Sequence, residues 1–213
     1  MKQQTKKDAP KKLAFIQFSV LLGIEIIFCF TPLGTLPALG PLSATLSHVP
    51  VIVTAIVMGP LWGSAMGFAF GMCSFIYWTF VSPGVFSFIY TPFYTAGEVG
   101  GNAASLLICF LPRILIGTFA GLLFNALQHT AFKEKGSALI AGAVGSLTNT
   151  ILVLGGIWLF FGSEYMTLTG STKAIYIVLG TTVLTNGLPE AVIGAVIGAF
   201  VAVPVLRAVR KMR

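Results

Sequence analysis

Charged side chains are the scarcest feature of this sequence. Only 9% of its 213 residues are Asp, Glu, Lys or Arg, whereas 56% are hydrophobic and the mean hydropathy is +0.93. Soluble domains carry about 25% charged residues, so these charges are too few to cover a water-facing surface of this size. The composition therefore excludes an ordinary soluble domain and predicts a protein whose solvent is lipid.

Cysteines and enzyme motifs are equally sparse. The three cysteines, Cys29, Cys73 and Cys109, lie in apolar stretches without a C-x-x-C pair, which does not support a disulfide framework or a zinc site. The sequence lacks G-x-x-x-x-G-K-[ST], H-E-x-x-H and G-x-S-x-G, and no His and carboxylate cluster suits a metal. We therefore expect no catalytic residues, no metal, no cofactor and no ATPase activity of the chain's own.

The positive charges that are present gather next to the apolar runs. The net charge is +7, and most of it comes from Lys2, Lys6, Lys7, Lys11 and Lys12 at one end and from Arg207, Arg210, Lys211 and Arg213 at the other. Such charges act as topology signals beside membrane spans. This interpretation is favoured over a basic tail that binds nucleic acid. The long first apolar run also favours a retained span over a cleaved signal peptide.

Six apolar runs are candidates for membrane-spanning helices, each of which needs about 20 mostly apolar residues. They lie at 13–30, 43–59, 62–81, 103–127, 137–161 and 176–206. The second run is short, and Gly59–Pro60 joins it to the third as a tight hairpin. A kink is expected near Pro189 in the long last run. The sequence thus predicts an all-α integral membrane protein with a six-helix transmembrane domain at 13–206, flanked by basic cytoplasmic tails at 1–12 and 207–213.

The orientation follows from the distribution of Lys and Arg. Of the 13 such residues, all but Arg113 and Lys173 fall in the segments on one side of these six spans. Positive loops lie in the cytoplasm, so both termini are predicted to be cytoplasmic in a multi-pass protein of the cell membrane. The outer loops at 31–42, 82–102 and 162–175 are long, and the first two are rich in Pro. They resemble lids that cap a ligand pocket more than they resemble spacers.

Three ionisable residues lie inside predicted spans, where central placement costs roughly 2.5–3.5 kcal/mol. They are Glu25, Arg113 and Glu190. Arg113 lies about ten residues, or about 15 Å, from the outer end of its span. Its guanidinium suits a carboxylate, which belongs either to a ligand or to Glu190 at a similar depth. Both alternatives stay open, and no partner is predicted for Glu25.

Further polar residues could converge with Arg113 on one cavity. Asn186 and Glu190 are four residues apart and share a helix face. Pockets for small molecules combine apolar walls with a few convergent polar groups. The predicted substrate-binding residues are Arg113, Asn149, Asn186, Glu190, Tyr90, Thr148 and His48. The alternatives are a helix-to-helix hydrogen bond for Asn149 and a structural role for His48.

Small residues recur every four positions in several spans, which lets helix backbones approach closely in lipid. Most of these strips are interpreted as internal packing. The strip of Ser19 and Gly23 on the first span has a second interpretation, in which it faces a partner membrane protein.

Four stretches carry a resemblance to a known family. They are GPLSATLSHVPVIVTAIVMGPLWGSAMGFAFG (40–71), FSFIYTPF (86–93), CFLPRILIG (109–117) and TNGLPEA (185–191). Along nearly its whole length, the chain resembles the S components of energy-coupling factor (ECF) transporters, which are substrate-binding membrane subunits for vitamins. The later motifs are most similar to the pantothenate-specific branch.

The resemblance implies a vitamin captured from outside beneath the outer loops. It also implies partners, namely a transmembrane scaffold subunit and two cytoplasmic ATPases, and a subunit that topples in the membrane to release its substrate inward. Docking in this family typically uses an A-x-x-x-A strip on the first span. Ser19 and Gly23 stand at the matching positions, a departure that keeps the residues small.

Pantothenate fits these residues best, because Arg113 suits its carboxylate while Thr148, Asn149 and Asn186 suit its hydroxyls and amide. Folate, riboflavin or a pyridoxine relative remain alternative vitamins. A stand-alone secondary carrier, a lipid-modifying enzyme and a scaffold without ligand are the competing classes. A secondary carrier would transport without ATPases. A lipid-modifying enzyme needs a nucleophile or metal site that the sequence lacks. A scaffold without ligand leaves Arg113 unexplained.

Overall fold

The computed structural model describes residues 2–34, 45–170 and 174–212. Most of the predicted outer loop at 31–42, with Pro37 and Pro41, lies outside the described residues, as does Lys173. The helices are α1 (Lys2–Phe30), α2 (Val49–Met58), α3 (Pro60–Ile76), α4 (Ala103–Leu127), α5 (Lys133–Thr169), α6 (Ile175–Thr182), α7 (Leu188–Ile197) and α8 (Val203–Met212). A small antiparallel hairpin of β1 (Thr95–Ala96) and β2 (Val99–Gly100) interrupts them.

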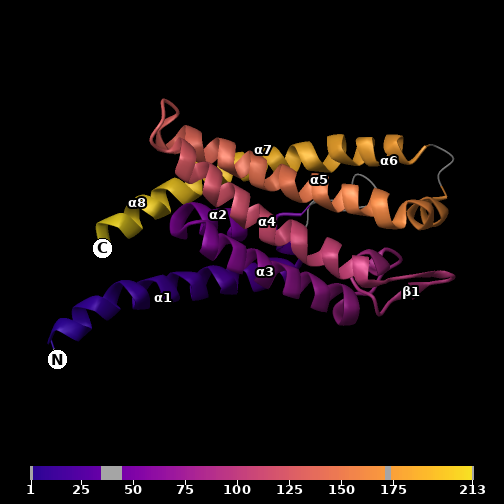
Figure 1. Cartoon of the computed structure of the whole chain (residues 1–213), viewed down its shortest axis with the longest axis horizontal. Helices are drawn as coiled ribbons and strands as arrows, with labels where there is room; N and C mark the ends of the chain where they lie inside the picture. The colour runs from indigo at the N-terminus through magenta and orange to yellow at the C-terminus, as the bar shows by residue number, and fades with distance from the viewer. Residues whose placement is uncertain (1, 35–44, 171–173, 213) are drawn as a thin grey trace.

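Five helical segments of the described chain are long and apolar enough to cross a membrane. They are Lys12–Phe30, Pro60–Val81, Ala103–Leu127, Lys133–Thr169 and Ile175–Lys211. Figure 1 places both chain ends and the α4–α5 turn at one end of the bundle, and the β1–β2 hairpin at the opposite end. The predicted class of an all-α membrane protein is therefore confirmed.

The second predicted span, 43–59, differs from the structure. α2 has ten residues, which at 1.5 Å per residue reach about 15 Å, half of the hydrocarbon core. All residues from Val49 to Val57 are buried, because α1, α3, α4, α5, α7 and α8 all contact this helix. A helix that is apolar all round belongs in such an interior position.

The structure also extends the first helix. α1 begins at Lys2, so most of the basic segment predicted as a tail at 1–12 continues the span as helix. Lys and Gln fill most of this segment, and both favour helix. In the span Lys12–Phe30, only 6% of the most apolar window is buried by the described residues. This part of α1 is therefore largely uncovered by the rest of the described chain.

Glycines bring α3 and α4 into backbone contact. A Cβ atom on Gly117 would lie 2.1 Å from the carbonyl carbon of Gly63, and one on Gly67 would lie 2.1 Å from the carbonyl oxygen of Arg113. On the next seam, a Cβ on Gly142 of α5 would lie 2.1 Å from the carbonyl oxygen of Gly194 in α7. The small-residue strips of these helices therefore serve internal packing, which fixes the rotation of α4 and α5.

The last long helix is a continuous segment that holds two π-helical turns, η4 (Val183–Gly187) and η5 (Gly198–Ala202). Each turn ends shortly before a proline, Pro189 and Pro204 respectively. Proline has no N–H for the carbonyl four residues earlier, and a π turn accommodates the interrupted pattern. The irregularity expected near Pro189 thus takes the form of a π turn. α5 is irregular as well, because Phe161 within it has non-helical backbone angles (φ −138°, ψ 23°).

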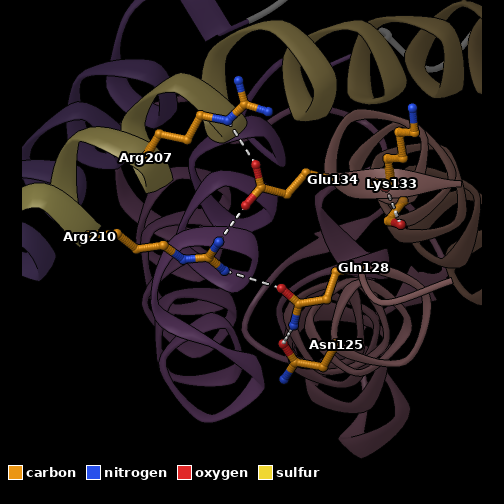
Figure 2. Close-up of polar contacts among 7 residues, drawn as sticks. Asn125, Gln128, Lys133, Glu134, Arg207 and Arg210 are labelled. Carbon is orange, nitrogen blue, oxygen red and sulfur yellow. Dashed lines mark hydrogen bonds and ion pairs between the residues drawn. The ribbon is translucent and has the colours of Figure 1, made fainter.

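An ionic cluster lies at the end of the bundle that holds the chain termini (Figure 2). Glu134, in the first turn of α5, accepts a hydrogen bond from Arg207 Nε at 2.7 Å and a second from Arg210 Nη1. Arg210 Nη2 also donates to Gln128 Oε1 at 3.1 Å. The cluster therefore ties α8 to the start of α5 and to the end of α4.

Candidate functional site

A cavity lies between the middle of α4, α5 and the last long helix. The cavity is small: its volume is about 80 Å³, below the roughly 300–1,000 Å³ of small-molecule pockets. The residues that line it are Thr45, Tyr90, Arg113, Asn149, Thr150, Val153, Leu154, Thr182, Asn186 and Glu190. Five of the predicted substrate-binding residues therefore meet at one hollow.

Arg113 is the cationic group of this cavity and is only 6% exposed. Its Nη1 donates to the carbonyl oxygen of Ile108 at 2.7 Å. The guanidinium carbon lies 5.0 Å from the ring centre of Tyr90 and 5.4 Å from that of Phe70, so the two rings stabilise the cation by cation–π contact. Nε is buried and has no hydrogen-bond partner among the described residues. Arg113 thus keeps hydrogen-bonding capacity that the described part of the chain does not use.

Tyr90 reaches the cavity from the loop before α4. Asn102 and Ser105 form a capping box at the start of α4, and Ser105 Oγ donates to the carbonyl oxygen of Phe88 at 2.5 Å. This bond fixes the loop two residues before Tyr90. The ring of Tyr90 stacks on the ring of Trp78, with 5.4 Å between the two ring centres. Burial raises the pKa of the Tyr90 hydroxyl, so this group stays a neutral donor at physiological pH.

Glu190 supplies the opposite wall and is 5% exposed. Its Oε1 accepts the backbone N–H of Thr45 at 2.5 Å, and its Oε2 accepts the hydroxyl of Thr150 at 3.4 Å. Within the described ranges, the ion pairs closer than 4.0 Å are those of Glu134 with Arg207 and Arg210. Arg113 and Glu190 therefore share the cavity without forming a direct ion pair.

The fifth helix contributes a different threonine from the predicted one. Thr148 donates to the carbonyl oxygen of Val144 at 2.7 Å and is not among the residues that line the cavity, whereas Thr150 is. Residues 149, 150, 153 and 154 form one helical face, because neighbours three and four apart lie together. Asn149 is on this face, and its Oδ1 is buried without a hydrogen-bond partner.

Four other lining residues were absent from the prediction, namely Thr45, Val153, Leu154 and Thr182. Two of them, Thr182 and Val153, had a usable signal. Thr182 lies four residues before Asn186, which lies four before Glu190, so one helical row predicts all three. Val153 lies four residues after Asn149, and an apolar residue at that spacing on a polar face indicates a cavity wall. Thr45 had no such signal, because its place depends on the fold of the chain before α2.

His48 lies behind the cavity rather than in it. Its side chain is fully buried and lies near the backbone of Thr45 and Glu190, but it is not among the lining residues. This position favours the structural alternative for His48, in which it supports the segment that carries Thr45.

The two predicted docking residues lie away from the cavity. Ser19 and Gly23 are exposed on α1, and a Cβ atom on Gly23 would meet nothing within 4 Å. Glu25, on the same helix, is fully buried and accepts a hydrogen bond from the thiol of Cys29 at 3.2 Å. The strip of Ser19 and Gly23 is therefore not packed against the described parts of the molecule.

The described part of the chain holds no group of three or more His, Cys, Asp or Glu side chains that could bind a metal. A buried cavity with one cation, one carboxyl group, amides and hydroxyls instead suits a small polar organic molecule. Together with the apolar helices, it defines a multi-pass membrane protein that holds a polar site within its bundle.

Comparison with known proteins refines this class. The family model described as "ECF transporter, substrate-specific component" matches residues 11–206. The pantothenic acid transporter PanT of Lactococcus lactis subsp. cremoris (strain MG1363) is 39% identical over 171 residues, which cover 80% of this chain and 81% of PanT. The chain belongs to the family of substrate-specific components of ECF transporters.

Proposed function

We propose that this chain captures pantothenate in the cavity around Arg113, as the substrate-binding subunit of an ECF-type importer. One observation carries the proposal. Arg113 is a buried guanidinium with an unpartnered Nε and no carboxylate within 4.0 Å in the described chain. A buried cation without a counter-ion is costly unless a ligand supplies one. The likeness to PanT supports pantothenate as that ligand.

The lining residues match the chemistry of pantothenate along its length. Its carboxylate takes the place of the missing counter-ion at Arg113 through charge-assisted hydrogen bonds. Its amide and hydroxyls meet Asn149, Asn186 and Thr150, and Glu190 accepts from a hydroxyl. Val153 and Leu154 provide an apolar wall for the two methyl groups. Tyr90 covers the cation from the loop side.

The topology and partners are part of the same proposal. Both termini lie in the cytoplasm, α2 completes a sixth pass as a short interior helix, and the cavity opens to the outside. A transmembrane scaffold subunit docks on the strip of Ser19 and Gly23, and two cytoplasmic ATPases drive release. The exposure of this strip and the weak burial of α1 support this choice of surface.

Calorimetric titration of the purified chain tests the substrate. Pantothenate is expected to bind at micromolar concentration or tighter, and Arg113→Ala is expected to weaken binding by more than about tenfold, which is about 1.4 kcal/mol. Arg207→Ala is the matched control, because Arg207 lies in the exposed cluster at the chain termini. If pantothenate gives no heat but folate, riboflavin or pyridoxine does, that vitamin replaces pantothenate as the proposed substrate.

Docking needs a separate test. Gly23→Leu is expected to preserve vitamin binding and to abolish copurification with the scaffold and ATPase subunits. Gly155→Leu is the control, because a Cβ on Gly155 of α5 also meets nothing within 4 Å. Gradient-driven uptake by proteoliposomes that contain this chain alone would instead establish a secondary carrier.

A further inference from the structure

Pro112 lies inside α4, immediately before the cationic residue of the cavity. In an α-helix, the N–H of residue 112 would donate to the carbonyl oxygen of residue 108. Proline has no N–H, and its ring also pushes against that carbonyl. The carbonyl oxygen of Ile108 is therefore deprived of its regular helical donor in the middle of a buried helix, where an unsatisfied acceptor is costly.

The guanidinium of Arg113 takes up this carbonyl. Its Nη1 donates to the Ile108 oxygen at 2.7 Å, so the side chain turns back along its own helix and spans five residues. This turn holds the guanidinium between the rings of Tyr90 and Phe70. It also leaves Nε without an acceptor among the described residues.

We propose that Pro112 is a positioning residue for the ligand site, which it serves by freeing the Ile108 carbonyl to anchor the Arg113 guanidinium. The proposal rests on the proposed binding of an anionic vitamin at Arg113, and it adds the element that sets the geometry of the cation. A guanidinium held in one orientation loses less entropy when it binds a carboxylate. Binding is therefore stronger than a freely rotating arginine would give.

The sharpest variant is Pro112→Ala, because it restores a backbone hydrogen bond while it leaves Arg113 in the sequence. The new N–H competes for the Ile108 carbonyl, and the guanidinium loses part of its anchor. We expect about a tenfold loss of affinity for pantothenate with an unchanged or higher thermal unfolding temperature. Pro204→Ala is the matched control, since it also fills a proline position in a helix but lies outside the cavity lining.

A ligand without the carboxylate separates positioning from general damage. Pantothenol carries an alcohol in place of the carboxylate, so it gains little from an oriented guanidinium. Pro112→Ala should therefore weaken pantothenate binding about tenfold and change pantothenol binding by less than about twofold. Equal losses for the two ligands, or no loss for pantothenate, would overturn the positioning role.

A vitamin-independent measurement keeps this test distinct from the test of the function. In protein labelled with ¹⁵N-arginine, the anchored Nη1 of Arg113 should show slow rotation and slow hydrogen exchange, with the signal assigned by its loss in Arg113→Lys. Pro112→Ala should abolish the slow signal, and Pro204→Ala should keep it. If the wild-type chain fails to bind pantothenate, the proposed function falls, and this signal alone decides the role of Pro112. A slow signal that survives in Pro112→Ala refutes the anchor.

Discussion

Two regions of the molecule hold arginines in opposite ways. At the end with the chain termini, Arg207 and Arg210 share Glu134 and are 56% and 50% exposed in their side chains (Figure 2). In the middle of the bundle, Arg113 is 6% exposed and meets a carbonyl oxygen and two aromatic rings, but no carboxylate within 4.0 Å in the described chain.

The difference separates structure from binding. Exposed ion pairs contribute about 0–1 kcal/mol, so the cluster at Glu134 fixes which helices meet without dominating stability. A buried cation without a counter-ion is destabilising on its own. Under the proposed function, a ligand in the adjacent cavity supplies this counter-ion. The same type of side chain would then tie helices together at one site and bind a ligand at the other.

The largest effect is expected from Arg113→Met, which removes the buried charge and keeps much of the side-chain volume. Vitamin affinity should fall by more than about tenfold. In the ligand-free protein, the removed cost of burying the charge is offset by the Ile108 carbonyl, which loses its donor, so the net change in stability should stay within about 1 kcal/mol. Calorimetric titration measures the affinity, and thermal unfolding in detergent measures the stability. Arg207→Met should instead lose about 0.5 kcal/mol. A large loss of stability in Arg113→Met would assign Arg113 to structure and remove the contrast between the two regions.

The next effect concerns the carboxyl group of Glu190. Glu190→Gln keeps an amide oxygen for the Thr45 N–H and turns its N–H₂ group to the Thr150 hydroxyl, which can accept a hydrogen bond. The bond from the Thr45 N–H then goes to a neutral oxygen instead of a carboxylate, so we expect a loss of about 1 kcal/mol, which denaturant titration of the purified protein detects. An unchanged stability would show that these contacts contribute little.

A smaller effect distinguishes the two threonines of α5. Thr150→Val should weaken vitamin binding about threefold, the value of a weak neutral hydrogen bond, because its hydroxyl lies in the cavity and contacts Glu190. Thr148→Val should leave the affinity unchanged, since that hydroxyl is bonded to the backbone of its own helix. The reverse result would restore the original prediction of Thr148 as the ligand contact.

The smallest effect is expected at Glu134. Glu134→Gln should cost no more than about 0.5 kcal/mol per lost ion pair at low ionic strength. The loss should shrink further in 1 M salt, where the Debye length is about 3 Å. Unfolding curves at two salt concentrations test this. A salt-independent loss of several kcal/mol would show that the cluster at the chain termini is as critical as the cavity.

Local sequence determined much of the fold. The apolar run at 103–127 predicted the fourth span with the same bounds as α4. The structure adds a capping box of Asn102 and Ser105 where that run begins. The prediction that Arg113, Asn149 and Glu190 converge on one cavity used their similar depth in the membrane and the free-energy cost of placing polar side chains in lipid.

Features that depend on tertiary packing could not be predicted. The run at 43–59 has the hydropathy of a span, and only its burial by the surrounding helices distinguishes α2 as a short interior helix. The choice between Thr148 and Thr150 depends on the rotation of α5, which the contact of Gly142 with Gly194 sets. Neither contact is encoded within a local window of residues.

The last two helical segments are long compared with the membrane, so we expect bilayer thickness to affect how they tilt. α5 and the segment Ile175–Lys211 have 37 residues each. Because α5 is kinked at Phe161, its part at 133–160 extends about 42 Å, whereas the last segment follows a path of about 55 Å, against a hydrocarbon core of about 30 Å. At a tilt of about 40° these rise about 32 and 42 Å, still more than the hydrocarbon core. Because Asn149 and Asn186 lie on these helices, we expect lipid acyl-chain length to alter the tilt and the width of the cavity. Vitamin affinity in liposomes of graded chain length would measure this coupling.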